Sequence, residues 1–280
     1  MDLISAGVDI GSTMTKVVLM NTGIITSVIG PTGAEHRRLS NKVMEQALEQ
    51  AGISFKDVSY VLATGYGRIN VPFADKQITE ITCHARGVYS LFPTVRTIIE
   101  IGGQDSKAIK LKDGKVANFA MNDQCAAGTG RFLEVIAEAL EISLEEMSQL
   151  ALKALKKEEI SNICTIFAEQ EIISSLADGA ALEDIMAGIF AAISRQVFKL
   201  AERLVVEKDV VITGGGAKSA GLLKAFEEKL GFPALVPEEP LLTGAIGAAL
   251  LGRDLAIKSL EKGGSIRHRA NQLGKATFYE

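Results

Sequence analysis

The sequence of 280 residues lacks the signatures of several large classes of protein. Its three cysteines are too few for a disulfide scaffold. No run of about eighteen apolar residues occurs, so we expect no membrane-spanning helix and no membrane partner. The formal net charge of −4 gives no strong case for nucleic acid as a partner. The opening Met-Asp-Leu-Ile-Ser has no basic segment before an apolar one, so we expect no export signal and a cytoplasmic protein.

The residues that are present indicate a globular protein with a large core. Apolar residues make up 47% of the chain, and 280 residues are enough for two medium-sized domains. We predict an α/β protein with domains at residues 1–95 and 96–258 and a loose polar tail at 259–280. An odd number of cysteines in a reducing compartment suggests free thiols, a redox site or metal ligands.

An internal repeat supports two domains of like topology. VDIGSTMTKVVLM (Val8–Met20) aligns without gaps with IEIGGQDSKAIKL (Ile99–Leu111), at an offset of 91 residues. The pairs at matched positions include Asp9 with Glu100, Gly11 with Gly102, and Lys16 with Lys107. An offset of this size is too long for a solenoid repeat. The alignment therefore predicts two domains that each open with a β-hairpin around a glycine turn.

Hydrophobic periodicity predicts the remaining elements. In the first domain we expect a strand, turn and strand over residues 5–20, a β-rich run at 24–29, helices at 35–51 and 74–89, and a strand at 58–64 that ends in a glycine turn. After the second hairpin we expect a mostly helical chain, with helices at 130–140, 144–156, 165–177, 182–206, 221–230 and 242–258 and one strand at 209–213. The last helix is expected to pack back on the first domain.

Three glycine turns, DIGST, EIGGQDS and ITGGGAKS, each follow an apolar strand. Glycine permits positive φ angles and close approach of a phosphate to the backbone. Ser12 and Thr13 can donate hydrogen bonds, and Lys16 can add a positive charge. Asp9 and Asp105 are candidate Mg²⁺ ligands. Asp105 or Gln104 could orient a water molecule against a γ-phosphate, which makes Asp105, Gln104 and Asp9 the candidate catalytic residues.

Each turn alone is a weak signal, and neither a Walker A pattern nor a GxGxxG fingerprint is present. In this order, the three turns resemble the actin, hexokinase and heat-shock-chaperone ATPase superfamily. The resemblance implies an actin-like ATPase fold in which two ribonuclease-H-like domains hold the nucleotide between them. It implies that ATP or ADP is bound by Gly11, Ser12, Thr13, Lys16, Gly102, Gly103, Gln104, Asp105, Gly128, Gly214, Gly215, Gly216 and Lys218.

Cys125 and Cys164 each stand before a helical run, in CAAGTGRFLEVIAEAL and CTIFAEQEIISSLADG. A helix N-terminus favours a thiolate, and its N–H groups suit an anionic iron–sulfur cluster. The two cysteines are 39 residues apart without a CxxC motif, so one chain cannot complete a four-cysteine site. A two-fold dimer would supply four thiolates. The alternative is that both are small buried residues.

Five segments resemble one ATPase family more closely. They are NDQCAAGTGRFLE, CTIFAEQEIIS, LATGYGR, ADKQITEITCHARG and IGGQDSK. They look like the activator component of 2-hydroxyacyl-CoA dehydratases, a family that includes ATP-binding subunits of benzoyl-CoA reductase and reductases of double-cubane-cluster proteins. The likeness covers residues 4–258. It implies a homodimer with one [4Fe–4S] cluster bound by Cys125 and Cys164 of each copy, a reduced ferredoxin or flavodoxin as electron source, and an iron–sulfur protein as acceptor.

Two other readings stay open at this point. A small-molecule kinase would use Asp105 as general base, and a metal-free regulatory clamp would bind ATP without a cluster. Both leave the two cysteines before helices unexplained. Cys83 and His84 are adjacent on an expected helix and point about 100° apart, so we read Cys83 as structural. TGYGR (Thr64–Arg68) is either a plain turn or part of a cleft or docking face.

Overall fold

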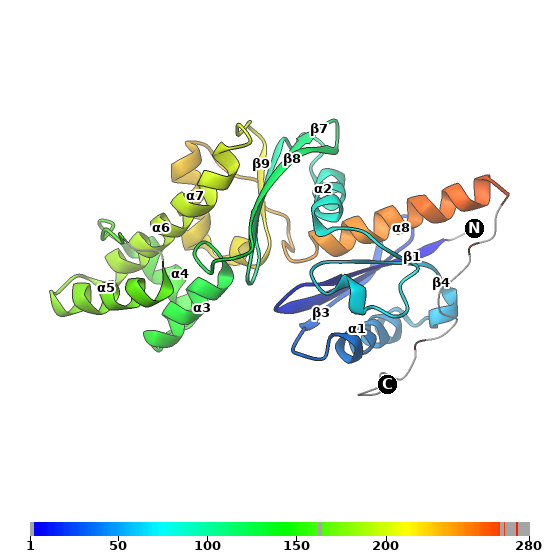
Figure 1. The fold of residues 1–280 in the computed structure, drawn as a ribbon, viewed down its shortest axis with the longest axis horizontal. Helices are drawn as coiled ribbons and strands as arrows, with labels where there is room; N and C mark the ends of the chain where they lie inside the picture. The colour runs from blue at the N-terminus through cyan, green and yellow to red at the C-terminus, as the bar shows by residue number, and fades with distance from the viewer. Residues whose placement is uncertain (1–2, 162–163, 264–265, 267–272, 274–280) are drawn as a thin grey trace. The chain divides into compact units, whose positions relative to one another are not determined.

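The structure is a computed structural model that describes residues 3–161, 164–263, 266 and 273. The chain forms two compact units (Figure 1). The first takes in the described residues up to Pro93, residues 113–116 and the described residues from Leu241 onward. The second takes in residues 94–112 and 117–240. Most of the expected tail at 259–280 lies outside the described residues.

The first unit is built on a five-stranded sheet in the order β3-β2-β1-β4-β5. Its strands are β1 (Ile4–Ile10), β2 (Met14–Met20), β3 (Ile24–Pro31), β4 (Val58–Thr64) and β5 (Lys76–Gln77). Strand β1 is antiparallel to β2 and parallel to β4. Nearly every residue of β1 and β2 is buried, as expected for central strands that are covered on both faces.

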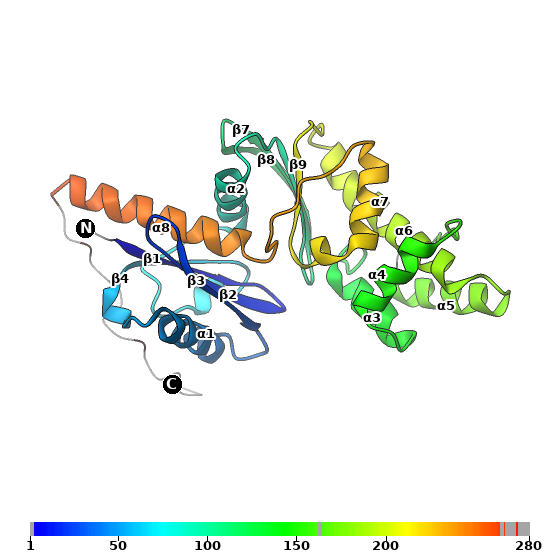
Figure 2. The same cartoon turned by 180° about the vertical axis from the view of Figure 1, so that it is seen from behind.

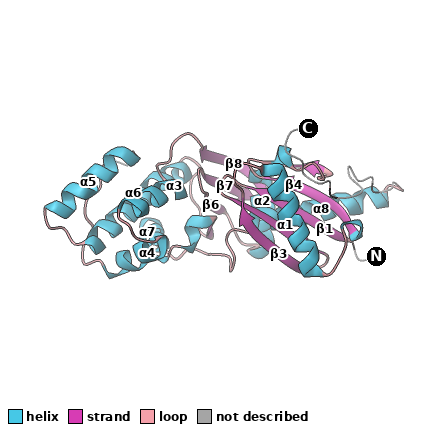
Figure 3. Cartoon of the chain, turned by 90° about the horizontal axis from the view of Figure 1, so that it is seen from below, coloured by secondary structure: helices cyan, strands magenta, loops and turns pink. Residues whose placement is uncertain are grey.

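Helices cover both faces of this sheet. Helix α1 (His36–Ala51) packs on β1, β2 and β3 and crosses the strands in Figure 3. Helices α2 (Glu80–Leu91) and α8 (Thr243–Glu261) pack together on the opposite face, where α8 contacts β1, β2 and β4 (Figures 1 and 2). Two short turns of 3₁₀ helix, η1 (Phe55–Asp57) and η2 (Arg68–Asn70), flank β4. The last long helix of the chain thus completes the first unit.

Small residues let α2 and α8 approach each other closely. A Cβ at Gly87 would overlap the carbonyl oxygen of Thr243, and a Cβ at Gly247 would overlap the carbonyl oxygen of Cys83. These are backbone atoms, so the neighbour cannot rotate away as a flexible side chain could. The crossing of the two helices therefore requires glycine at both positions.

A Gly247→Ala substitution is expected to lower the free energy of unfolding by about 3 kcal/mol or more, because overpacking against fixed backbone forces the helices apart. Thermal or urea unfolding followed by circular dichroism measures it. Gly23→Ala is the matched control, since a Cβ at Gly23 would meet nothing within 4 Å. Equal stabilities of the two variants would contradict the close packing.

The second unit has a four-stranded sheet in the order β8-β7-β6-β9. Its strands are β6 (Thr97–Ile101), β7 (Ser106–Lys112), β8 (Lys115–Asn122) and β9 (Val210–Thr213). Its helices are α3 (Gly130–Ala139), α4 (Leu144–Lys153), α5 (Thr165–Ala177), α6 (Leu182–Glu202) and α7 (Ala220–Leu230), with a 3₁₀ turn η3 (Gly215–Lys218). The helices gather beside the sheet in Figures 1 and 2, and one large apolar core joins them to β6, β7 and β9.

The expected repeat is visible in the two sheets. Strand β6 is antiparallel to β7 and parallel to β9, as β1 is to β2 and β4. The expectation of a mostly helical chain after the second hairpin was wrong for residues 115–122, which form β8. Strand β3 starts at residue 24 and β8 at residue 115, which is again 91 positions later. The third strand therefore belongs to the repeat.

The last helix, predicted at 242–258, runs on to Glu261, and three other predicted helices are shorter than expected by three or more residues. The helix expected at 74–89 begins only at Glu80, because Asp75 Oδ2 accepts a hydrogen bond from the N–H of Val61 at 2.8 Å and holds this segment at the sheet edge. Helix α4 ends at Lys153 rather than 156, where Asp184 Oδ1 accepts the next free N–H groups. Helix α6 ends at Glu202 rather than 206, three residues before Val205, which has a φ of +58°.

No helix in the described part of the chain is both long enough and apolar enough to cross a membrane.

Candidate functional site

The first glycine turn joins β1 to β2 and ends in exposed polar residues. The N–H of Gly11 donates to the carbonyl oxygen of Met14 at 3.0 Å and closes the turn. Ser12 is half-buried and Thr13 is exposed. Below them Asp9, which is 3% exposed, accepts a hydrogen bond from Lys16 Nζ at 3.2 Å. The turn therefore presents hydroxyl and amide groups above a buried ion pair.

Asp9 also lies beside polar groups of α2 and α8. A Cβ at Gly244 would come within 2.8 Å of Asp9 Oδ2 and 3.3 Å of His84 Nε2. His84 Nδ1 lies 2.9 Å from Thr243 Oγ1, and both residues are buried. His84 was predicted only as the neighbour of Cys83 on a helix, and neither His84 nor Thr243 was predicted to lie near Asp9, because both are distant from it in the chain.

The second glycine turn joins β6 to β7 and is held by charges. The N–H of Gly102 donates to the carbonyl oxygen of Asp105 at 2.9 Å. Lys107 Nζ donates to Glu100 Oε2 at 2.7 Å and to Asp105 Oδ2 at 2.8 Å. Burial by itself would lower the pKa of Lys107, but the two carboxylates raise that pKa above its ordinary value. Gln104 is exposed at the tip of the turn. The repeat aligns Lys107 and Glu100 with Lys16 and Asp9, but neither Lys107 nor Glu100 was predicted as a site residue.

The segment around Gly128 joins the second turn to α3. The N–H of Gly130 donates to the carbonyl oxygen of Gly102 at 2.9 Å, and the N–H of Arg131 donates to that of Gly103 at 2.7 Å. Gly128 itself is buried, with a φ of +85°, against Val197 and Gln196. The amides at the start of α3 are therefore bonded to the second glycine turn.

The third glycine turn follows β9 and is packed under β6. Gly214 has a φ of +83°, and its N–H donates to the carbonyl oxygen of Pro240 at 3.0 Å. A Cβ at Gly214 would lie 2.8 Å from Glu100 Oε1. Gly215 and Lys218 are exposed, Gly216 is buried, and Lys218 Nζ pairs with Glu239 Oε2 at 2.9 Å. The second and third turns are thus brought together around Glu100.

TGYGR is the counterpart of the third turn in the first unit. In the sheets, Asp9 pairs with Thr64 as Glu100 pairs with Thr213. Gly65 then has a φ of +85°, close to that of Gly214, and a Cβ on Gly65 would overlap the Asp9 carboxylate. The TGYG and TGGG turns therefore repeat each other, a likeness that sequence analysis missed because the intervening segments differ in length.

Cys125 and Cys164 are both exposed free thiols. Cys164 is the N-cap residue of α5, whereas Cys125 lies in a loop, five residues before α3 begins at Gly130. The expectation that both stand directly before a helix is thus correct for Cys164 alone. Asn122 Nδ2 donates to the carbonyl oxygens of Cys125 and Ala127 at 2.9 and 3.0 Å and shapes the loop. Helices α3 and α5 pack against each other.

Cys83 is fully buried on α2, and burial raises its pKa to about 12. Only the thiolate is reactive, so this thiol is inert near neutral pH. Labelling with an excess of a disulfide reagent at pH 8 is expected to modify Cys125 and Cys164 quickly in the metal-free chain, and Cys83 only after denaturation. Cys83→Ala is the control, since it should leave the fast count unchanged. Three fast thiols would contradict this assignment.

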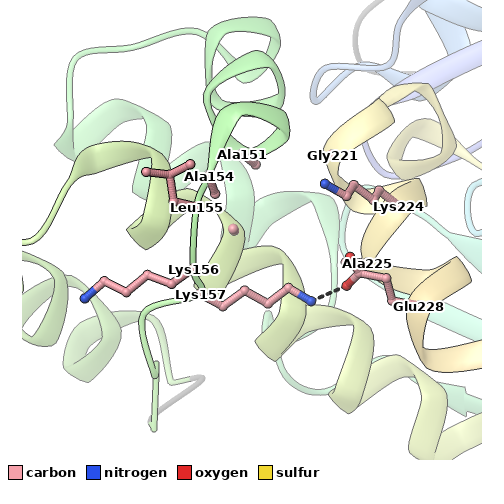
Figure 4. A pocket seen from close by; sticks show the side chains of 10 residues that line it. Ala151, Ala154, Leu155, Lys156, Lys157, Gly221, Lys224, Ala225 and Glu228 are labelled. Carbon is pink, nitrogen blue, oxygen red and sulfur yellow. Dashed lines mark hydrogen bonds and ion pairs between the residues drawn. The ribbon is translucent and has the colours of Figure 1, made fainter.

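A hollow between α4, α6 and α7 lies apart from these residues (Figure 4). Small side chains such as Ala151, Ala187 and Ala225 line it, together with three lysines, and Lys157 pairs with Glu228 across it. It contains none of the predicted site residues.

Comparison with known proteins places these features in one family. The profile of the BadF/BadG/BcrA/BcrD ATPase family matches residues 6–252. The chain is 46% identical to the activator of lactoyl-CoA dehydratase from Anaerotignum propionicum over 255 residues, which are 90% of this chain and 98% of that protein.

Two solved structures are also similar over most of the chain. Component A of (R)-2-hydroxyglutaryl-CoA dehydratase from Acidaminococcus fermentans is 40% identical, with a TM-score of 0.88 over 91% of this chain and 99% of that one. The activator of 2-hydroxyisocaproyl-CoA dehydratase from Clostridium difficile, with bound ADPNP, is 41% identical, with a TM-score of 0.86 over 95% of this chain and 100% of that one.

A glucokinase from Streptomyces griseus shares the fold alone, at 14% identity and a TM-score of 0.56 over 90% of this chain and 99% of that one. The predicted α/β, actin-like ATPase fold is therefore confirmed. Together, the profile match and the identity over nine-tenths of the chain show that this protein belongs to the BadF/BadG/BcrA/BcrD ATPase family.

Proposed function

We propose that the protein is an ATP-hydrolysing, homodimeric activator that drives a one-electron, low-potential reduction of a partner iron–sulfur enzyme. The proposal depends on one combination of observations. The chain is 46% identical to a dehydratase activator, and its Cys125 and Cys164 are exposed and free. The partner is a 2-hydroxyacyl-CoA dehydratase or a related iron–sulfur protein, such as a benzoyl-CoA reductase core or a double-cubane-cluster protein. A reduced ferredoxin or flavodoxin in the cytoplasm supplies the electron.

The glycine turns support the nucleotide part of the proposal. The half-buried Ser12 and the exposed Thr13 and Gln104 offer hydroxyl and amide groups that suit the phosphates of ATP, and the third turn with Lys218 suits the nucleoside. Asp9 and Asp105 are hard oxygen donors of the kind that Mg²⁺ prefers. Bound Mg²⁺ would offset the negative charge of the phosphates. The first glycine turn lies in the first unit, and the second and third turns lie in the second unit.

The two exposed cysteines support the cluster part. A [4Fe–4S] cluster requires four thiolates, and each copy of the chain offers two that are open to a second copy. The N–H groups at the start of α5, which Cys164 precedes, would offset part of the negative charge of a bound cluster. When bound, the cluster would store and pass on one electron. A kinase or a metal-free regulatory clamp would not require these two cysteines.

A continuous run of contacts links the proposed phosphate site to the cysteines. The second glycine turn is hydrogen-bonded to the start of α3, the loop of Cys125 precedes α3, and α3 packs on α5, which begins after Cys164. ATP can shift the electron-transfer equilibrium only through its different affinity for two conformations. For a one-electron couple, a tenfold difference corresponds to about 59 mV.

Anaerobic purification followed by iron analysis and electron paramagnetic resonance (EPR) tests the proposal. We expect a brown dimer with about four irons that hydrolyses ATP and, once reduced, activates a dehydratase. A colourless chain without iron after anaerobic reconstitution would contradict the cluster. If that chain also phosphorylated a small molecule, the kinase reading would replace the proposal. Nucleotide binding without hydrolysis or iron would favour the regulatory clamp.

A further inference from the structure

Lys107 stands between two carboxylates in the second unit and is almost completely buried. Its Nζ lies 2.7 Å from Glu100 Oε2 and 2.8 Å from Asp105 Oδ2. The exposed fractions of the side chains are 4% for Lys107, 7% for Glu100 and 24% for Asp105. One ammonium between two carboxylates leaves one negative charge in excess. Asp105, as the more exposed partner, is the carboxylate that can meet an incoming cation.

The two carboxylates are held in different ways. Glu100 belongs to the central strand β6, opposite Lys107 of β7 and Thr213 of β9. Its Oε1 lies under both glycine turns, since a Cβ at Gly102 would come within 3.2 Å of this oxygen. Asp105 belongs to the turn itself, just before β7 begins. Glu100 is therefore positioned by the sheet, whereas Asp105 is positioned by the turn.

The first unit contains the ion pair without the third member. Asp9 and Lys16 pair at the positions that match Glu100 and Lys107. The residue 91 positions before Asp105 is Met14, which cannot share a lysine. A lysine between two carboxylates is therefore a property that the second turn has and the first turn lacks.

We propose that Lys107 is a positioning residue. It pairs with Asp105 while the site is empty and releases Asp105 when the metal-bound nucleotide binds. Glu100 stays paired with Lys107 throughout and so allows the release. This inference rests on the proposed function, because it takes Asp105 as a ligand of Mg²⁺ or of a metal-bound water. A buried ammonium that lost its last carboxylate would be costly. Glu100 prevents that cost, so Asp105 can exchange Lys107 for the cation.

A double-mutant cycle between Glu100 and Asp105 tests this hand-over. The quantity measured is the affinity of Mn²⁺ for the ADP-loaded chain, read from the EPR signal of free Mn²⁺ with the protein oxidised. We expect Glu100→Gln to weaken Mn²⁺ binding about tenfold, because Lys107 then keeps Asp105 as its sole carboxylate, and a hydrogen bond between charged groups is worth at least one decade. Glu100→Asp, which copies the ion pair of the first unit, should restore binding to within a few-fold.

The same substitution made in an Asp105→Asn chain distinguishes release of Asp105 by Lys107 from a direct electrostatic effect of the Glu100 charge on the cation. In Asp105→Asn, adding Glu100→Gln should change Mn²⁺ affinity less than twofold, since no carboxylate is left to release. An equal loss of Mn²⁺ affinity in the wild type and in Asp105→Asn would overturn the proposal, because the charge of Glu100 would then act on the cation without Asp105. The double variant leaves Lys107 without either carboxylate. If it or Glu100→Gln does not fold, the uncharged pair Glu100→Gln with Lys107→Met replaces it and should bind Mn²⁺ at least as well as the wild type; a tenfold loss there would overturn the proposal.

Steady-state kinetics provide a second readout. Lys107→Met should lower kcat for ATP hydrolysis about tenfold with KM for ATP within twofold, and Lys107→Arg should recover most of that loss. An unchanged kcat in Lys107→Met would overturn the positioning role but leave the proposed activator intact. A wild-type chain that binds no Mn²⁺ with ADP would overturn both.

Discussion

A Cys164→Ala chain is expected to fold, bind ATP and hydrolyse it, yet contain almost no iron and fail to activate a dehydratase. Cys164 is exposed, and its side chain makes no capping hydrogen bond, so its loss removes no packing and no cap from α5. The dimer would keep two of four thiolates, too few for a stable [4Fe–4S] cluster. Iron content per dimer should fall from about four to below one, and visible absorbance and the activation of the partner should fall with it.

Two companion variants make this expectation specific. Cys125→Ala should lose iron in the same way, because its thiol is equally exposed. Cys83→Ala is the matched control: it should keep the iron and lose stability instead, since Cys83 is packed with Leu62 and Ala248. An iron-replete Cys164→Ala chain, or an iron-free Cys83→Ala chain, would show that the ligands have been assigned wrongly.

The repeat explains how much of the fold could be read from the sequence. Apolar strands around glycine turns are local patterns, so the two hairpins and the amphipathic helices were predictable. Strand β8 was missed because its residues, KVANFAMN, lack a clear alternation of apolar and polar side chains, and none of them is buried. The offset of 91 residues contained the missing information, since the third strand of the first unit predicts one at 115.

The predicted ends of elements failed where a distant side chain decides them. Helix α4 stops at Lys153 because Asp184, about thirty positions later in the chain, accepts the N–H groups of Leu155 and Lys156. The segment before α2 is held by a carboxylate that bonds to β4. Neither contact has a local signature, so periodicity alone extends both helices too far.

The candidate site divides in the same way. Glycine turns and their polar residues are contiguous, so the sequence marks them directly. The partners beneath them are not contiguous. His84 and Thr243 are 159 residues apart and meet where α2 and α8 cross, and Gly244 there lies beside both His84 and the Asp9 carboxylate. Lys107 could have been found from the repeat, because its counterpart Lys16 was already a candidate.

An Asp105→Asn substitution is expected to reduce kcat for ATP hydrolysis about a hundredfold or more while leaving the free energy of unfolding nearly unchanged. The loss follows if Asp105 holds the metal or orients the attacking water, since asparagine keeps the shape but loses the charge. Stability should survive because Lys107 stays paired with Glu100 at 2.7 Å. ATP turnover and urea unfolding of the same preparation measure both quantities. Asp113→Asn, in the hairpin turn between β7 and β8, is the control.

Asp9→Asn should behave differently, and the contrast separates binding chemistry from stability. Asp9 is the carboxylate paired with Lys16, whose side chain is 11% exposed, so its removal leaves a buried ammonium without that partner. Breaking a buried pair on one side costs about 3–5 kcal/mol. Turnover and stability should therefore fall together in Asp9→Asn, but turnover alone in Asp105→Asn. If Asp105→Asn hydrolysed ATP at the wild-type rate, the catalytic carboxylate would have to be sought at Asp9, in the first glycine turn.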